Sequence, residues 1–125
     1  MRITLAVLQA LQGNKFLQGS LRRSVEASVS RNADHSYYYT RAVLQGPFPL
    51  GEPAIATSAK FSYYYARYVL KEPFPLGEEA IAMKAEVAIM YARYVLHGRF
   101  ELGEPQIARL INYKRDYEKE FGVKL

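Results

Sequence analysis

Charged side chains that could carry chemistry recur along this chain at a regular interval. The set comprises the arginines Arg41, Arg67 and Arg93 and the glutamates Glu52, Glu78 and Glu104. A row of arginines could bind phosphates. Lys60 and Lys71 add positive charge around Arg67, but the equivalent positions around the other two arginines are not basic. Because a guanidinium binds a carboxylate bidentately, we expect each arginine to pair with a glutamate of its own or an adjacent unit.

Little else in the sequence offers catalytic or metal chemistry. The absence of cysteine excludes disulfides, thiol nucleophiles and cysteine metal sites. The two histidines, His35 and His97, occupy different positions of the repeat, and no catalytic partner converges on the Glu78-Glu79 pair. No phosphate-binding loop, nucleophile elbow or dinucleotide fingerprint is present. We therefore expect no enzymatic activity, no cofactor and no metal site.

The eleven tyrosines of this basic chain raise the possibility of base stacking. Tyr37, Tyr38 and Tyr39 are consecutive, however, and side chains about 100° apart on a helix cannot share one face. The third unit has Ile89 and Met90 in place of the first two tyrosines. Aliphatic residues cannot stack on bases in this way, so we expect the tyrosines to pack in the core or between units.

The recurrence that carries these residues defines three units, 37–62, 63–88 and 89–114. A period of about 26 residues is typical of stacked repeat proteins. Ten positions are identical in all three units, and seven of them are apolar or aromatic. The seven, expected in the core, are represented in the first unit by Tyr39, Val43, Leu44, Phe48, Leu50, Ile55 and Ala56. Gly51 and its equivalents indicate a turn or a close approach of the backbone.

Each unit reads as two helices. Ser58 can cap a helix over about 59–71, and Pro73 ends it. Phe-Pro-Leu-Gly is expected to be an extended connector, and Glu52-Pro53 begins a short second helix. One such hairpin cannot bury its apolar faces, whereas stacked hairpins can. The sequence therefore predicts an all-α fold, a short α-solenoid of stacked helical hairpins with N- and C-terminal capping helices.

The hydrophobic fraction of 50% fits one domain over residues 1–125. Within it, we interpret residues 1–36 as an N-terminal cap or degenerate repeat. The apolar spacing after Pro105 predicts a capping helix over 105–125, continuous with the short helix of the third unit. No apolar run is long enough to span a membrane, and we expect a cytoplasmic location without membrane partners.

The phrases Tyr-Ala-Arg-Tyr-Val-Leu at 91–96 and Gly-Arg-Phe-Glu-Leu-Gly-Glu-Pro-Gln-Ile-Ala at 98–108 carry a resemblance. The chain resembles tandem repeat proteins of tailed bacteriophages, an uncharacterised group with similar phrases at about this period. The resemblance covers residues 37–112 and fails over the first 36. It implies a phage or prophage origin, and therefore the host-cell cytoplasm, together with a helical repeat. It implies no activity and no site residues.

These observations predict a non-enzymatic protein-binding module. Positions that vary between units are free of a common packing constraint, and they begin at Thr40, Gln45, Gly46 and Thr57. The candidate protein-binding residues are Arg67, Lys71, Glu72, Arg93, His97 and Arg109. With the phage resemblance, the expected partner is a host or defence protein that the chain modulates or inhibits.

Two alternatives stay open. The net charge of +5 permits binding of RNA or single-stranded DNA. The candidate residues for that function are Arg22, Arg23, Arg67, Lys71, Tyr63 and Tyr64. The other alternative is a structural, self-assembling phage protein.

Overall fold

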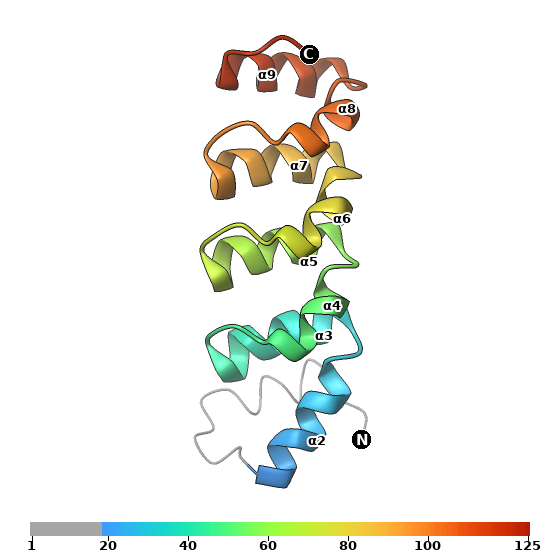
Figure 1. Ribbon diagram of the computed structural model, residues 1–125, viewed down its shortest axis with the longest axis vertical. Coiled ribbons are helices and arrows are strands. Elements are labelled where there is room, and N and C mark those ends of the chain that lie inside the picture. Colours follow the sequence, from blue (N-terminus) through green and yellow to red (C-terminus); the bar gives the residue numbers. More distant parts are fainter. Residues whose placement is uncertain (1–18) are drawn as a thin grey trace.

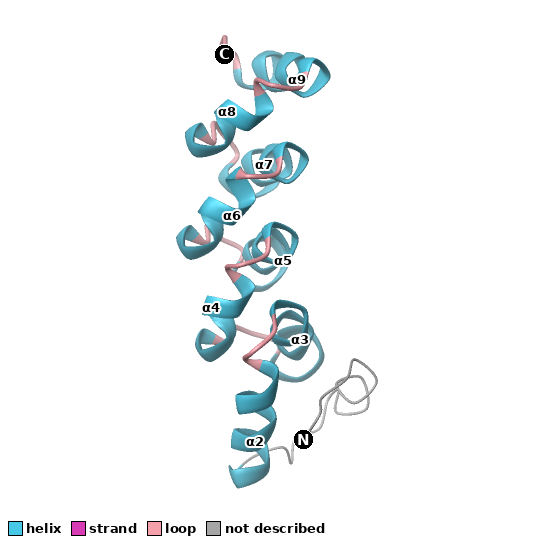
Figure 2. Ribbon diagram, turned by 90° about the vertical axis from the view of Figure 1, so that its right-hand side faces the viewer, coloured by secondary structure: helices cyan, strands magenta, loops and turns pink. Residues whose placement is uncertain are grey.

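The computed structural model describes residues 19–125, and every regular element in that range is a helix. The predicted all-α class is confirmed. Figure 1 shows the helices α3, α5, α7 and α9 one above another along the long axis of the molecule. The short helices α4, α6 and α8 connect these layers, and Figure 2 shows them along one side with the long helices along the other.

The element order repeats. Helix α2 spans Gly19–Val29. The long helices are α3 (Ala33–Tyr39), α5 (Ala59–Tyr64) and α7 (Ala85–Tyr91), which continue as π-helical turns Thr40–Leu44, Tyr65–Leu70 and Ala92–Leu96. 3-10 turns follow at Pro49–Gly51, Pro75–Gly77 and Glu101–Gly103, and lead into the short helices α4 (Glu52–Ile55), α6 (Glu78–Ala82) and α8 (Glu104–Ile107). The last element is α9 (Ile111–Phe121). We call residues 47–55, 73–81 and 99–107 the return segments.

The long helix of the second unit begins as predicted. The Ser58 hydroxyl accepts a hydrogen bond from the Phe61 N–H at 3.1 Å, which satisfies one of the free donors of the first turn. In the described chain, Lys84 at the same position before α7 makes no side-chain cap bond, since an ammonium has no acceptor. The short helices also begin as predicted, at Glu52 and Glu104.

The long helices end at residues with left-handed backbone. Gln45, Lys71 and His97 have φ of 53°, 56° and 54°, a conformation that usually falls to glycine. The N–H of Gln45 reaches the Thr40 carbonyl at 2.6 Å, which closes the π-type turn. The end predicted near residue 71 is therefore confirmed. The residue type differs among the three units at this position, which suggested a contact surface. The backbone conformation at the position is nevertheless the same in all three units.

The sequence predicted an extended Phe-Pro-Leu-Gly connector. This prediction was wrong, because the connector contains a 3-10 turn. The Gly51 N–H donates to the Phe48 carbonyl at 3.0 Å and closes it. A Cβ on Gly51 would lie 2.5 Å from the Phe48 ring and 2.7 Å from the Ser36 Oγ. The predicted close approach is confirmed, because the return segment can lie against the long helix only where the side chain is absent.

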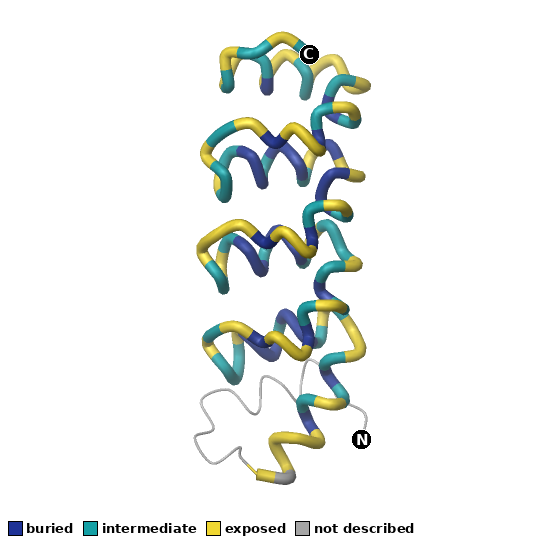
Figure 3. The backbone as a smooth tube through the Cα atoms, in the orientation of Figure 1, coloured by how far each residue is buried: buried dark blue, intermediate teal, exposed yellow. Residues whose placement is uncertain are grey.

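The core lies between the long helices and the return segments, where Figure 3 shows the buried positions. Tyr39, Tyr65, Tyr91 and the isoleucines 55, 81 and 107 are fully buried, as predicted. The prediction of burial was wrong for the leucine that directly precedes the repeated glycine. Leu50, Leu76 and Leu102 are 58%, 57% and 53% exposed, because each 3-10 turn directs its phenylalanine inward and leaves the leucine outside.

The C-terminal prediction also requires correction. Helix α8 ends at Ile107, a turn follows, and α9 begins at Ile111, so 105–125 is not one helix. The break has a reason in the repeat. Tyr117 lies one repeat period after Tyr91 and is fully buried in the equivalent place, which the chain reaches only by turning back as in earlier units.

The described part of the N-terminal segment continues the same register. Glu26 and Val29 precede Glu52 and Ile55 by one repeat period, and Val29 is fully buried like that isoleucine. Residues 1–18 of the predicted cap lie outside the described residues. Within 19–125, no helix combines the length and apolar character needed to cross a membrane.

Candidate functional site

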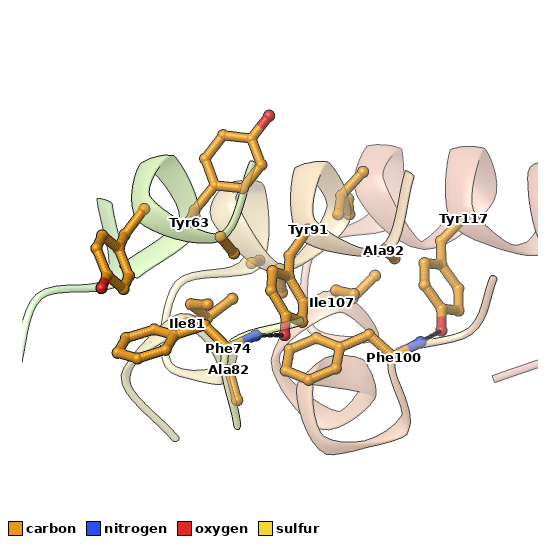
Figure 4. Packing of buried hydrophobic residues seen from close by; sticks show 14 of the residues in the cluster. Tyr63, Phe74, Ile81, Ala82, Tyr91, Ala92, Phe100, Ile107 and Tyr117 are labelled. Carbon is orange, nitrogen blue, oxygen red and sulfur yellow. Dashed lines mark hydrogen bonds between the residues drawn. The ribbon is translucent and has the colours of Figure 1, made fainter. Parts of the chain in front are cut away.

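A repeated hydrogen-bond relay joins each unit to the next. The Tyr65 hydroxyl donates to Glu52 Oε2 at 2.6 Å and accepts from the Phe48 N–H at 2.9 Å. Tyr91 makes the same two bonds with Glu78 and Phe74, and Tyr117 makes them with Glu104 and Phe100. Figure 4 shows the Tyr91 and Tyr117 hydroxyls directed at these N–H groups. Tyr39 donates to Glu26 at 2.7 Å in the same way.

The relay holds the tyrosine protons firmly. Burial, followed by the hydrogen bond to Glu52, raises the pKa of Tyr65 far above its ordinary value. The same causes raise the pKa of Tyr117 to about 12. A phenol of raised pKa stays neutral at physiological pH and is a poor base or nucleophile. The relay therefore registers the units rather than offering acid–base chemistry.

The sequence predicted ion pairs between the repeated arginines and the repeated glutamates. This prediction was wrong. Within the described chain, those glutamates accept from the relay tyrosines, and only Glu104 also meets an arginine, the non-repeated Arg99 at 2.8 Å. The three arginines find other acceptors. Arg41 donates to the Tyr68 carbonyl at 3.2 Å, Arg67 to the Tyr63 hydroxyl at 2.7 Å, and Arg93 to Glu120 at 2.8 and 3.1 Å.

Arginine and tyrosine side chains alternate along the π-helical ends of the long helices. The Arg67 guanidinium lies 4.1 Å from the centre of the Tyr94 ring and 5.0 Å from that of Tyr68. Arg41 lies 5.6 Å from the Tyr68 ring, and Arg93 lies 5.8 Å from the Tyr94 ring. Each arginine thus contacts an aromatic ring and a hydrogen-bond acceptor of the same chain. These contacts weaken the hypothesis that the arginines form a phosphate-binding stripe.

The structure brings together most of the residues predicted to bind protein. Arg67, Lys71, Glu72 and His97 line one hollow of about 210 Å³, beside Tyr94. Arg93 lines a different hollow with Asp116, Lys119 and Glu120. Arg109 lies on the turn before α9 and lines a third hollow. The six residues therefore do not form one site.

One group of variable positions is not on the surface. Thr40, Ala66 and Ala92 are fully buried, so their variation reflects packing rather than partner contact. Met83, by contrast, is 65% exposed, and its equivalents Thr57 and Arg109 are exposed as well.

The residues proposed for nucleic-acid binding are not assembled on one surface. Tyr63 is only 2% exposed and cannot offer its ring to a base. Arg22 belongs to α2 and pairs with Glu26 at 2.9 Å, whereas Arg67 lies in the π-helical turn after α5 and Lys71 directly follows that turn.

Sequence reasoning missed an apolar surface on the return segments. We call Leu50, Leu76 and Leu102 the leucine row. Each occupies the same place in its 3-10 turn, and Pro49 and Pro75, which precede two of them, are exposed as well. Perfect recurrence had suggested the core, but the more informative signal was the next residue: a glycine pressed against the long helix turns the leucine before it outward.

A second surface of interest lies where the short helices lead into the first halves of the long helices. Two hollows, of about 660 and 390 Å³, share Lys84 and Glu86, and we call them together the inter-helix groove. The first is lined by Lys60, Tyr64, Val87 and Met90, among others. The second is lined by Met83, Arg109, Leu110 and Tyr113, among others.

The two surfaces differ in charge. The return segments that carry the leucine row hold five carboxylates, Glu52, Glu78, Glu79, Glu101 and Glu104, against one arginine, Arg99. The inter-helix groove holds Lys60, Lys84 and Arg109 against one carboxylate, Glu86. Only Glu79 and Glu101 of the five carboxylates are exposed, and Glu104 is paired with Arg99. The return segments therefore carry a small excess of negative charge, and the groove an excess of positive charge, on one molecule of net charge +5.

Comparisons with protein-family models, with curated proteins and with solved structures found no match to this chain. The resemblance to phage repeats stays a prediction.

Within residues 19–125, no three potential ligands among histidine and carboxylate side chains cluster closely enough to hold a metal ion.

Proposed function

We propose that this chain is a non-enzymatic protein-binding module, built as a short α-solenoid of stacked helical hairpins. The repeated order of long helix, 3-10 turn and short helix supports this architecture, as does the relay that recurs at each junction between units. Repeat stacks of this kind present long surfaces whose outward residues are independent of the core.

The leucine row is the observation that carries the proposal. Three identical residues stand at identical places with more than half of their surface exposed. Packing within the chain covers less than half of each leucine at these places. Because each leucine is already nearly half covered, burying the rest of it against a partner contributes about half of the value for complete burial, or about 1–1.5 kcal/mol. Exposed apolar patches with a polar surround are typical of protein contact surfaces.

The kind of target within this proposal follows from the resemblance to phage repeats alone. It is a host or defence protein that a phage accessory protein binds and modulates. The hollow lined by Arg67, Lys71, Glu72 and His97 offers charges of both signs. Such polar groups select a partner more than they hold it.

The proposal is tested by capture from a lysate of the natural expression host. The wild type is compared with the variant L50S/L76S/L102S and with L21S, which alters a leucine of α2 that is 50% exposed. We expect a protein that the wild type and L21S retain and the row variant loses. That protein, once purified, should form a stoichiometric complex of weak salt dependence. Retention of every partner by the row variant would refute the proposal.

Nucleic-acid binding is the second candidate, and a direct titration separates it from the first. Labelled single-stranded DNA and RNA are titrated with the chain at low and at physiological salt, with fluorescence anisotropy as the readout. A nucleic-acid binder loses affinity steeply as salt rises, because it releases counterions. The internal engagement of Arg41, Arg67 and Arg93 leads us to expect no such binding.

A further inference from the structure

The leucine row and the inter-helix groove repeat with the same step. Successive leucines are separated by one unit of the repeat. The two hollows are separated by one unit as well, since Val87 of the first is replaced by Tyr113 in the second, and Lys84 by Leu110. Two leucines of one molecule can therefore face two hollows of another at the same time. An unrelated partner would match this spacing only by chance.

The charges of the two surfaces are complementary. Of the five carboxylates in the return segments, Glu79 and Glu101 are exposed, and the three bound by the relay tyrosines are half-buried. The groove carries Lys60, Lys84 and Arg109 with only Glu86. Apolar side chains would thus enter the groove with acidic groups beside its basic rim. Complementary potentials of this kind favour association and fix the register of the partners.

The two surfaces lie on different parts of the stack. The leucine row belongs to the 3-10 turns that lead into the short helices. The groove is lined by the first halves of the long helices and by residues in or directly after the short helices, among them Met83, Gln106 and Arg109, so the two surfaces have no residue in common. One molecule can therefore offer its row to one neighbour and its groove to another.

We propose that the partner of the leucine row is a second copy of this chain, which receives the leucines in its inter-helix groove. This inference rests on the proposed function, because it takes the row as a protein contact. The contact joins two different surfaces, so it does not close into a dimer and continues from copy to copy. The row of the last copy stays open and remains available to a different protein.

Sedimentation velocity of the full chain, after nuclease treatment and over a wide range of concentration, tests the proposal. We expect the wild type and L21S to grow beyond the dimer as concentration rises. L50S/L76S/L102S should remain monomeric, and so should the groove variant K84E/R109E. Because two leucines act together, L76S alone should weaken association by about tenfold or more. All the substituted residues are exposed, and circular dichroism checks that each variant is folded.

A mixing experiment separates this arrangement from any other. The row variant retains its groove, and the groove variant retains its row. Equal amounts of the two should form a heterodimer that grows no further, although neither associates alone. A wild type that stays monomeric at every concentration overturns the proposal, and so does association of the row variant or a mixture without a complex. A monomeric wild type that still captures another protein through the row overturns self-association and leaves the proposed function intact.

Discussion

The Tyr65 hydroxyl donates to Glu52, 13 residues earlier in the chain, at 2.6 Å, and this bond crosses the boundary between two units. The same oxygen accepts from the Phe48 N–H, so one buried phenol satisfies two groups of the preceding unit. The relation recurs at Tyr91 and Tyr117. It explains why a tyrosine and a glutamate, rather than two apolar residues, are repeated at these positions.

Replacing Tyr65 by phenylalanine should destabilise the stack by about 1–3 kcal/mol. The ring remains, but the buried Phe48 N–H loses its acceptor, and an unsatisfied buried donor carries its full desolvation cost. Urea unfolding measures the change. Tyr68→Phe is the matched control, since that side chain is 40% exposed. Equal stability losses in the two variants would contradict the role of the relay.

Stability should fall in alkaline solution from about pH 10 upward. The pKa of Tyr65, Tyr91 and Tyr117 is raised above the ordinary value of 10.0 in the folded chain, first by burial and then by a carboxylate neighbour. Above pH 10 the unfolded chain releases phenol protons that the folded chain keeps, so rising pH favours unfolding. Urea midpoints measured between about pH 9 and pH 11 check this. The slope should be shallower in Tyr65→Phe, and an unchanged slope would speak against it.

Gly77→Ala should destabilise the chain by about 1–3 kcal/mol, the usual effect of overpacking. A Cβ there would overlap the Ser62 side chain and lie 2.7 Å from the Phe74 ring. Gly98→Ala is the control, because its nearest neighbour would be the Leu96 carbonyl oxygen at 3.9 Å. We expect Gly98→Ala to be neutral in thermal melting. A comparable loss in both would mean that backbone freedom, not close approach, selects glycine.

Lys84→Ser should stabilise the third long helix by about 0.5–1 kcal/mol. Ser58 caps the second long helix at this position, whereas the lysine offers no acceptor to the first turn of α7. Chemical denaturation measures the gain, and Lys84→Ala distinguishes capping from loss of charge. If alanine stabilises as much as serine, the cap is not the cause.

Much of the fold follows from the sequence because the repeat samples each position three times. Identity at Tyr39, Phe48 and Ile55 reflected burial, and the glycine identity reflected contact with the neighbouring helix. Identity alone could not separate burial from an outward role, and so Leu50 was misplaced. Comparison of units that ended at residue 114 also missed Tyr117, although it lies one repeat period beyond Tyr91.

The predicted pairing of the repeated arginines with the repeated glutamates was wrong because of the directions in which the side chains leave the helix. Tyr65 and Arg67 are two residues apart in the π-helical turn, so their side chains leave the helix on roughly opposite sides. Tyr65 points at Glu52 in the return segment, and Arg67 therefore emerges on the other side, where it meets Tyr63 and Tyr94. A glutamate of the return segment could not satisfy both. Which partner each side chain contacts depends on the side of the helix from which it emerges. Charge and sequence spacing alone do not specify that side.

A double-mutant cycle should separate the two arrangements of Arg67. The variants Arg67→Gln and Tyr94→Leu, alone and combined, should show a coupling of about 0.5–1 kcal/mol in the free energy of unfolding, because the guanidinium lies over the ring at 4.1 Å. Arg67→Gln combined with Glu78→Gln should show no coupling, since Glu78 is bound by the Tyr91 hydroxyl. Coupling to Glu78 without coupling to Tyr94 would restore the ion pair that the sequence predicted. Raised salt supplies an internal check: it screens an exposed ion pair strongly, whereas the stacked arginine and tyrosine should retain most of their coupling.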